Sequence, residues 1–429
     1  MLSALILVLL LALLLGGIPV SFSLIVAGVI GLYFVGGPSF VLGFLTTTPL
    51  SVASSYELIT VPMFLLMAEF VILSGVADDI FHAAAAWVGR IPGGLGIATA
   101  IAGAGFGAIS GSSTAAAATL SSTSLPAMLK HHYEPKLASG VVAISGTLAM
   151  LIPPSIALVL YALVANVSVG KLLIAGVIPG LLVALTIALT VFVLVIMDPS
   201  RAPIRERYTF REKFASLKVA GPVLLLFMAV TGVIYTGVAT PTEASGLGAF
   251  GALLLAMRGG RLNAKTVWQA LGRSGRTTCM IVLIIIGAHV FGYFFTITRM
   301  PQAIIGFIGE VGASRWVVLG FVITLLLIMG CFLDQITIII LTVPVALPLL
   351  TSLGFDPIWF GVIFVVTAEV GMVTPPVGLN VFVVAKYTKQ PLQDIFRGVM
   401  PHVVAHLILI VILVVFPDII MWAPNQMDR

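Results

Sequence analysis

Proline positions repeat along this chain at a fixed distance. Twelve prolines lie in residues 1–207. Six of them are each followed by a second proline at the same distance along the chain, which is the distance from Pro19 to Pro241. At a background of about 5% proline, chance would give fewer than about one such pair. The six pairs are Pro19 and Pro241, Pro126 and Pro348, Pro135 and Pro357, Pro153 and Pro375, Pro154 and Pro376, and Pro179 and Pro401. We therefore expect two homologous halves.

Charged residues are too few for a water-soluble domain. They make up 9% of the 429 residues, and hydrophobic residues make up 60%, whereas soluble domains carry roughly 25% charged residues. At about 20 apolar residues per crossing, the length allows roughly ten membrane spans. Residues 1–15 lack a basic n-region and a small-residue cleavage site, so they are predicted to span the membrane rather than to form a signal peptide.

Net charge and cysteine content exclude other classes of protein. The 21 lysines and arginines give a net charge of +5, but they fall in separate short loops, which disfavours nucleic-acid binding. Cys279 and Cys331 both lie in apolar runs. Neither a disulfide framework nor a cysteine-based transition-metal site is therefore expected.

Hydropathy and chain breakers divide both halves into the same series of segments. The first half, 1–197, has scaffold spans within 1–75 (near 2–15, 18–35 and 56–75), a long apolar stretch at 91–129, an interrupted span at 138–165 and a span at 172–197. The second half, 219–429, has scaffold spans within 219–298 (near 219–236, 243–257 and 277–298), a long stretch at 316–350, an interrupted span at 358–386 and a span at 400–416. A polar, basic connector at 198–218 joins them.

The two long stretches are predicted to be re-entrant hairpins. At about 20 residues per crossing, the chain between Pro92 and Pro126 is too short for two full crossings and a turn, and too long for one crossing. Glycines and serines around Gly111 lie in the middle of the first stretch, and Asp334 lies in the middle of the second. Two shorter helices that meet at a polar tip fit this pattern better.

The distribution of basic residues predicts the topology. If hairpins count as no net crossing, each half crosses five times, so the second half is inverted relative to the first. With the connector in the cytoplasm, the predicted inside loops hold 17 of the 21 lysines and arginines, as the positive-inside rule requires. The predicted loop at 36–55 has none. Both termini are then expected on the periplasmic side.

This architecture is typical of secondary transporters. Inverted repeats with discontinuous helices place substrate and ion sites at mid-membrane, where the helices break. Unwound backbone cannot face lipid, so it lines an enclosed or wet cavity. Helix N-termini there attract anions, and free carbonyl groups attract cations. The chain is therefore predicted to be an all-α polytopic membrane protein with two inverted repeats, and not an enzyme.

Both predicted breaks carry ligands suited to a hard monovalent cation. At the first, Ser112 and Ser113 supply hydroxyl groups near the Pro153-Pro154 break. At the second, Asp334 is the one charged residue between Trp316 and Gly354, which is costly in a membrane unless it has a partner. Carbonyl, hydroxyl and carboxylate oxygens fit Na⁺, and the lack of a His/Cys cluster argues against a transition metal.

Four strings resemble the large membrane subunit of tripartite ATP-independent periplasmic (TRAP) transporters. They are Ser110-Gly-Ser-Ser-Thr114, Gly146-Thr-Leu-Ala-Met-Leu-Ile-Pro-Pro-Ser155, Ala239-Thr-Pro-Thr-Glu-Ala244 and Thr374-Pro-Pro-Val-Gly-Leu-Asn380. The resemblance covers essentially the whole chain. It implies a Na⁺-driven importer of the bacterial inner membrane that moves its solute by an elevator mechanism. It also implies a periplasmic binding protein that delivers a carboxylate-bearing solute, of dicarboxylate or sugar-acid type, and a separate small four-helix membrane subunit.

The resemblance and the pattern together give the candidate site residues. The sodium-binding candidates are Gly111, Ser112, Ser113, Gly146, Ala149 and Ile152 in the first half, and Gly330, Asp334, Gly371, Thr374 and Val377 in the second. The substrate-binding candidates are Thr114, Ser155, Gln335 and Asn380. Ala149 stands where the family pattern leads us to expect glycine, although a carbonyl ligand would survive that change.

Several structural readings remain open beside these roles. Ser112, Ser113 and Thr114 could simply allow tight helix packing, and the paired prolines could be ordinary kinks. Glu69 and Glu369 lie within apolar spans, where a carboxylate is either functional or structurally paired, and Glu69 has no partner visible in the sequence. Glu243 is expected to cap a helix, and His289 is expected to be a packing residue.

Other functions also remain possible at this point. A self-sufficient Na⁺/dicarboxylate carrier of the related two-hairpin superfamily would need no binding protein. An ion channel is a further alternative. An intramembrane hydrolase would need a Ser–His or paired-Asp arrangement, which the sequence spacing does not offer.

Overall fold

The computed structural model describes residues 2–203, 208–260, 262–300, 302–303, 306, 312 and 314–427. Within these residues the regular structure is entirely helical, so the all-α prediction is confirmed. Eight of the described helical segments are long and apolar enough to cross a membrane. The helices of the first half are α1 (Leu2–Leu15), α2 (Val20–Ala53), η1 (Tyr56–Ile59), α3 (Thr60–Ser74), α4 (Val76–Val88), α5 (Gly94–Ser110), α6 (Ser113–Lys130), α7 (Pro135–Ser145), η2 (Gly146–Met150), α8 (Ile156–Ala165) and α9 (Val169–Met197).

The second half follows a short turn, η3 (Pro199–Arg201), and repeats most of this order. Its described helices are α10 (Phe210–Tyr235), α11 (Pro241–Arg258), α12 (Ala264–Ile297), α14 (Arg315–Phe332), α15 (Gln335–Ser352), α16 (Pro357–Gly371), α17 (Leu379–Thr388), α18 (Leu392–Val415) and α19 (Asp418–Gln426). Helices α6 and α15 have the same length, and both ends of α15 follow those of α6 at the offset of the proline pairs. This helix therefore recurs at the spacing of the prolines.

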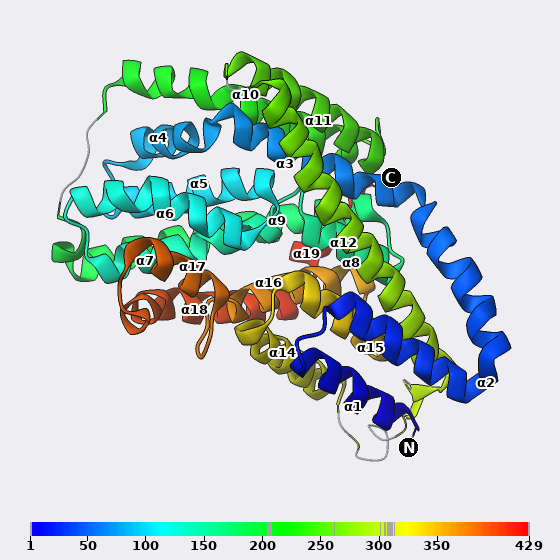
Figure 1. Cartoon of the computed structure of the whole chain (residues 1–429). Helices are drawn as coiled ribbons and strands as arrows, with labels where there is room; N and C mark the ends of the chain where they lie inside the picture. The colour runs from blue at the N-terminus through cyan, green and yellow to red at the C-terminus, as the bar shows by residue number, and fades with distance from the viewer. Residues whose placement is uncertain are drawn as a thin grey trace.

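The helices form two packed groups. Helices α2, α3, α10, α11 and α12 contact one another and make the scaffold, with α1 packed on α2. Helices α5 to α9 and α14 to α18 pack together and make a second group, which we call the hairpin body. Figure 1 shows α2 and α12 on one side of the molecule and α5, α6, α17 and α18 on the other. Helix α4 joins the groups by packing on both α5 and α10.

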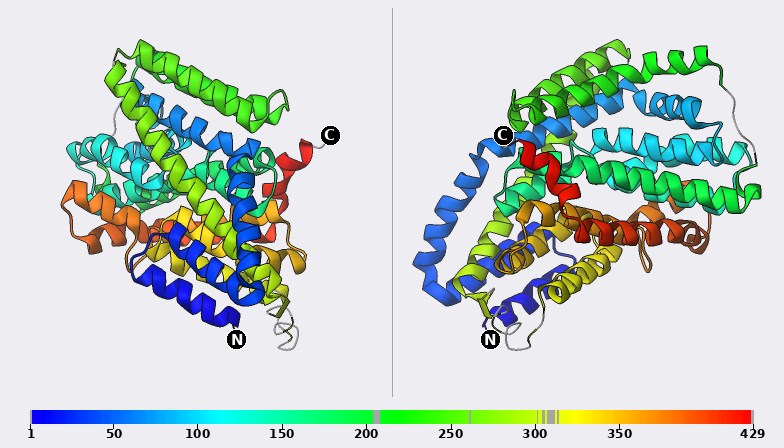
Figure 2. Two further views of the ribbon diagram at one scale, coloured as in Figure 1. Left: turned by 45° about the vertical axis from the view of Figure 1, so that its right-hand side comes forward. Right: turned by 180° about the vertical axis from the view of Figure 1, so that it is seen from behind.

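The scaffold helices are longer than predicted. Residues 36–55 were expected to form a loop, but α2 continues through them to Ala53 after a kink at Gly37, whose φ is +74°. A positive φ suits glycine because it has no Cβ, and Pro38 then begins the second part of the helix. Figure 2 shows α2 as a kinked arm at the edge of the molecule.

Other helical segments were missed by the hydropathy analysis because they carry polar residues. Helix α12 begins at Ala264 and not near residue 277. The hydropathy pattern placed its start too late, because the first turns carry charged side chains that lower the mean hydropathy. Helix α10 begins at Phe210, inside the predicted connector, where Thr209 and Glu212 form a capping box. The amphipathic helix α4 and the terminal helix α19 were not predicted.

Both predicted interruptions are present in the hairpin body. Helix α7 tightens into η2 and ends, and α8 starts again at Ile156. Helix α16 ends at Gly371 and α17 starts at Leu379. Two consecutive prolines lie in each gap, Pro153-Pro154 and Pro375-Pro376. Proline has no N–H and clashes with the preceding turn, so neither helix can continue through its gap.

Candidate functional site

The first hairpin turns at Gly111 and Ser112. Gly111 closes α5 with a φ of +56°, which makes it a left-handed C-cap of the type that glycine favours. The Ser112 hydroxyl begins α6 by accepting a hydrogen bond from the Ala115 N–H at 3.4 Å, and it lies 3.3 Å from the Thr114 hydroxyl. Ser113 is fully buried. The tip is therefore a tight turn lined by hydroxyl groups.

The backbone of the first tip lies directly against the first interruption. A Cβ added to Gly107 would come within 2.6 Å of the Ala149 Cα, and one added to Gly146 would lie 3.0 Å from the Ser113 carbonyl oxygen. All residues from 146 to 155 are buried. The Ile152 carbonyl accepts no hydrogen bond in the described part of the chain. The structure thus places the first tip against Gly146 and Ala149, two of the first-half sodium candidates.

Ser155 fixes the restart of the first broken helix. Its hydroxyl accepts from the Leu158 N–H at 3.1 Å and donates to the Met150 carbonyl oxygen. The side chain is fully buried. It therefore caps α8 and ties the restart to the end of η2, which is a structural role beside the predicted substrate contact.

The second hairpin turns at Leu333 and Asp334. Asp334 begins α15 by accepting from the Thr337 N–H at 3.3 Å and from the Thr337 hydroxyl at 2.6 Å. The side chain is exposed. The sequence left the partner of this carboxylate open, and the helix start supplies it, because aspartate is a preferred N-cap residue.

The second tip also packs backbone to backbone against its interruption. A Cβ on Gly330 would lie 2.6 Å from the Ala368 carbonyl oxygen and 2.7 Å from the Gly371 Cα. The Gly378 N–H donates to the Cys331 carbonyl at 3.1 Å. The Val377 carbonyl accepts no hydrogen bond within the described residues. Gly330, Gly371 and Val377 therefore lie at one place, beside the tip that carries Asp334.

Three further candidates have defined contacts. The Thr374 hydroxyl donates to the Val370 carbonyl at 2.6 Å. The Gln335 amide is fully buried and donates to the Val365 carbonyl at 3.2 Å. The Asn380 amide is fully buried and donates to the Ala143 carbonyl at 3.5 Å. The amide groups of Gln335 and Asn380 therefore lie within the packing of the hairpin body.

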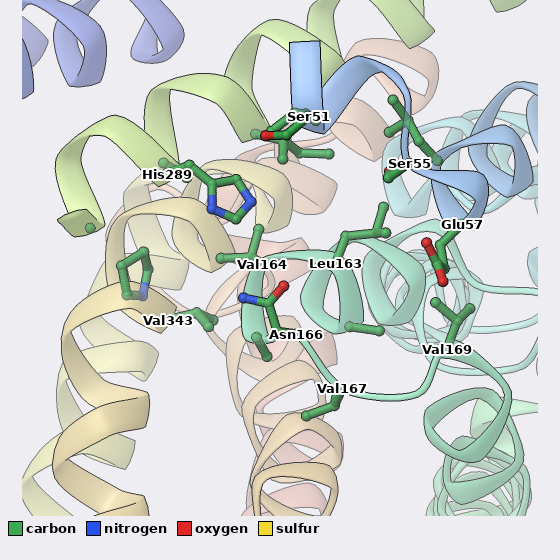
Figure 3. A pocket seen from close by; sticks show the side chains of 18 of the residues that line it. Ser51, Ser55, Glu57, Leu163, Val164, Asn166, Val167, Val169, His289 and Val343 are labelled. Carbon is green, nitrogen blue, oxygen red and sulfur yellow. The ribbon is translucent and has the colours of Figure 1, made fainter. Parts of the chain in front are cut away.

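A cavity of about 1080 Å³ lies between the scaffold and the hairpin body. The residues that line it belong to the end of α2, η1, the start of α3, the end of α8, the start of α9, the start of α11, α12 and α15. Figure 3 shows Ser51, Ser55 and Glu57 on one wall, facing Asn166 at the end of α8, with His289 on α12. The cavity is as large as typical small-molecule sites.

The candidate residues do not line this cavity. The sequence did not single out Glu57 and Asn166, which line the cavity and stand in short connections without a motif. Thr242 also lines it; it belongs to the Ala239–Ala244 string, but no site role was predicted for it. All of the connections at the cavity belong to the side that the loop charges predict as external. His289 was expected to be a packing residue, but it faces this space (Figure 3).

Two of the acidic residues left open in the sequence have structural partners. Glu69 on α3 forms a salt bridge with Arg273 on α12, with Oε2 2.6 Å from the guanidinium Nη2. This partner could not be inferred beforehand, because the two residues belong to different halves of the chain. Glu243 accepts from the Thr240 N–H at 2.8 Å and forms the expected capping box.

These features define a class: a helical, multi-pass membrane protein in which two hairpin tips meet two broken helices beside a scaffold. Comparison with known proteins narrows the class. Residues 7–419 match the family model of the tripartite ATP-independent periplasmic transporter, DctM component. The chain belongs to this family of transporter permeases, which confirms the resemblance.

Individual relatives agree with this assignment. The C4-dicarboxylate TRAP transporter large permease protein DctM of Pseudomonas aeruginosa is 38% identical over 373 residues, which cover 86% of each chain. The sialic acid TRAP transporter large permease protein SiaM of Vibrio cholerae is 32% identical over 97% of this chain and 96% of its own. The crystal structure of the YdaH transporter of Alcanivorax borkumensis shares the fold, with a TM-score of 0.64, 13% identity and coverage of 88% and 90%.

Proposed function

We propose that this chain is the translocating subunit of a sodium-driven TRAP importer in the bacterial inner membrane. One observation carries the proposal: each hairpin tip packs backbone to backbone against a helix interruption, at Gly107 with Ala149 and at Gly330 with Gly371. Such a junction gathers helix ends and unpaired carbonyl groups inside the protein. It is the arrangement with which secondary transporters bind ions at mid-membrane.

Sodium is the ion that suits these junctions. Na⁺ is a hard cation, and the ligands gathered at the two tips are hydroxyl, carbonyl and carboxylate oxygens. Among the described residues no cluster of three or more His, Cys, Asp or Glu side chains could hold a metal ion. Because the junction occurs twice, we propose at least two sodium ions in each transport cycle.

The solute is proposed to carry a carboxylate. Relatives are named for C4-dicarboxylate and sialic acid transport, and both kinds of molecule are carboxylates. The cavity between the scaffold and the hairpin body would admit the solute from the external side. Movement of the hairpin body along the scaffold, as an elevator, would then carry solute and ions across together.

Two protein partners follow from the proposed role. A periplasmic binding protein would deliver the solute to the external face, and a small four-helix membrane subunit would brace the scaffold in the bilayer. The exposed hydrophobic side chains of α10 and α11, such as Leu225, Met228, Leu247 and Phe250, leave apolar surface there for lipid or for that subunit.

Co-reconstitution tests the proposal against a self-sufficient carrier. Proteoliposomes are made with this chain alone, with the small subunit, and with both partners, and uptake of radiolabelled C4-dicarboxylate and sialic acid is measured. We expect uptake of one carboxylate only when the binding protein and the small subunit are both present. Uptake by this chain alone at the same rate would support the self-sufficient carrier instead.

A further inference from the structure

Glu369 is a buried carboxyl group in the middle of the hairpin body. It lies on α16, two residues before the helix ends, and only 2% of it is exposed. Its Oε1 has no hydrogen-bond partner among the described residues, and no described salt bridge includes it. An acidic residue placed in this way in a membrane protein is costly and is a functional candidate by default.

The carboxyl group faces the other half of the molecule. It lies beside the backbone N–H of Met150, the last residue of η2, on which α16 packs. Met150 lies between Ala149 and Ile152, two candidates for the first sodium site. Glu369 therefore lies against the turn whose carbonyl groups would hold the ion.

Two other contacts join the same segments. The Asn380 amide donates to the Ala143 carbonyl in α7, and the Ser113 hydroxyl lies 3.8 Å from the Met372 sulfur. All three contacts run from the second interruption to the first junction. The equivalent position of the first half is occupied by Thr147, whose hydroxyl donates to the Ile144 carbonyl of the adjoining α7 at 2.7 Å and so bonds within its own half.

We infer that Glu369 is a positioning residue for the first sodium site, acting through the Met150 backbone and making the geometry of that site depend on the second broken helix. The inference rests on the proposed sodium coupling. The acceptor oxygen holds η2 in place, and a tilt of α16 when the second site loads would move the carbonyl groups of the first. The two sodium sites are in this way coupled across the repeats.

Three variants separate position from charge and from packing. Glu369→Leu has a similar volume but no acceptor, and Glu369→Gln keeps an acceptor oxygen without the charge. Thr367→Val is the matched control, because Thr367 is a fully buried residue of the same helix whose hydroxyl has no partner in the described structure. Each variant is purified and reconstituted with both partners.

The first readout is amide hydrogen exchange over residues 146–152 without sodium, which reports on the turn itself. We expect at least tenfold faster exchange in Glu369→Leu and rates within twofold of wild type in Glu369→Gln and Thr367→Val. Unchanged exchange in Glu369→Leu would overturn the inference. Should Glu369→Leu fail to insert, the smaller Glu369→Ala takes its place with the same expectation.

The second readout is the sodium dependence of uptake. We expect the sodium half-saturation of Glu369→Leu to rise at least fivefold, with the maximal rate within twofold of wild type and the Hill coefficient close to one. A rise in the sodium half-saturation of Glu369→Gln equal to that of Glu369→Leu would contradict a positioning role, because the charge would then matter. If wild-type uptake does not depend on sodium, the proposed coupling fails, and the exchange result alone decides whether Glu369 holds the turn.

Discussion

The two junctions occupy equivalent places in the two halves but differ in their exposure and chemistry. Around the first, all residues from 146 to 155 are buried, and the tip offers the hydroxyl groups of Ser112 and Ser113. Around the second, Asp334, Pro375 and Pro376 are exposed and the tip carries a carboxylate. Homologous halves have therefore produced one enclosed junction with neutral side chains and one accessible junction with a carboxylate.

The cause of this difference is visible in the packing. Helices α5 and α6 of the first half enclose η2, and α16 of the second half packs on it as well. Asn380 donates to the Ala143 carbonyl, and Glu369 lies beside the Met150 backbone. We expect the accessible second site to exchange its ion first, and the enclosed first site to depend on it.

The largest effect is expected from the close backbone contact at the second junction. Gly330→Ala would place a Cβ 2.6 Å from a carbonyl oxygen and 2.7 Å from a Cα, and backbone atoms cannot move aside as a side chain can. Overpacking of this kind costs about 1–3 kcal/mol or more, so we expect the second tip to leave its junction and uptake to fall at least tenfold. Gly320→Ala, on the same helix with nothing within 4 Å, is the control and should transport normally. Normal uptake by Gly330→Ala would show that the junction is not needed.

The two tip residues should differ in their effect on sodium. Asparagine caps helices about as well as aspartate, so Asp334→Asn should fold normally while it loses the charge. We expect its sodium half-saturation to rise tenfold or more, about 1.4 kcal/mol for each tenfold. Ser112→Ala removes one cap and one neutral oxygen, and we expect a rise of no more than about fivefold, from about 1 kcal/mol. Equal effects of both changes, measured in reconstituted uptake, would show that the carboxylate gives the second site no special role.

The smallest effect is expected in the scaffold, away from both junctions. The Glu69–Arg273 pair joins α3 to α12, and the arginine side chain is 51% exposed. Exposed pairs contribute about 0–1 kcal/mol. In a double-mutant cycle of Glu69→Gln and Arg273→Gln, we expect a coupling free energy below about 1 kcal/mol in thermal unfolding. All three variants should retain most uptake. A loss of uptake as large as that of Gly330→Ala would place this pair in the transport pathway.

The sequence predicted those parts of the fold that depend on local chemistry. The double prolines predicted both interruptions, and the glycine, serine and aspartate residues predicted both tips, because these residues determine backbone conformation where they stand. The Thr240 and Glu243 capping box was predicted for the same reason. These features need no knowledge of the neighbouring helices.

Features that depend on distant packing could not be predicted. Helix α2 continues past Gly37 because α12 lies against it, and the polar first turns of α12 made its start look like a loop. The partner of Glu69 lies in the other half of the chain, and the cavity is lined by connections that come together only in the folded chain. Asp334 appeared to lack a partner because its partner, Thr337, forms part of the helix that it caps.

The sodium dependence of uptake tests the central claim most directly. Proteoliposomes that contain this chain and both partners are supplied with solute while external Na⁺ is varied against choline at constant ionic strength. Two coupled sodium sites predict negligible uptake in choline and a sigmoidal rise with Na⁺, with a Hill coefficient above one. A hyperbolic solute uptake that is unchanged when choline replaces Na⁺ would contradict the account.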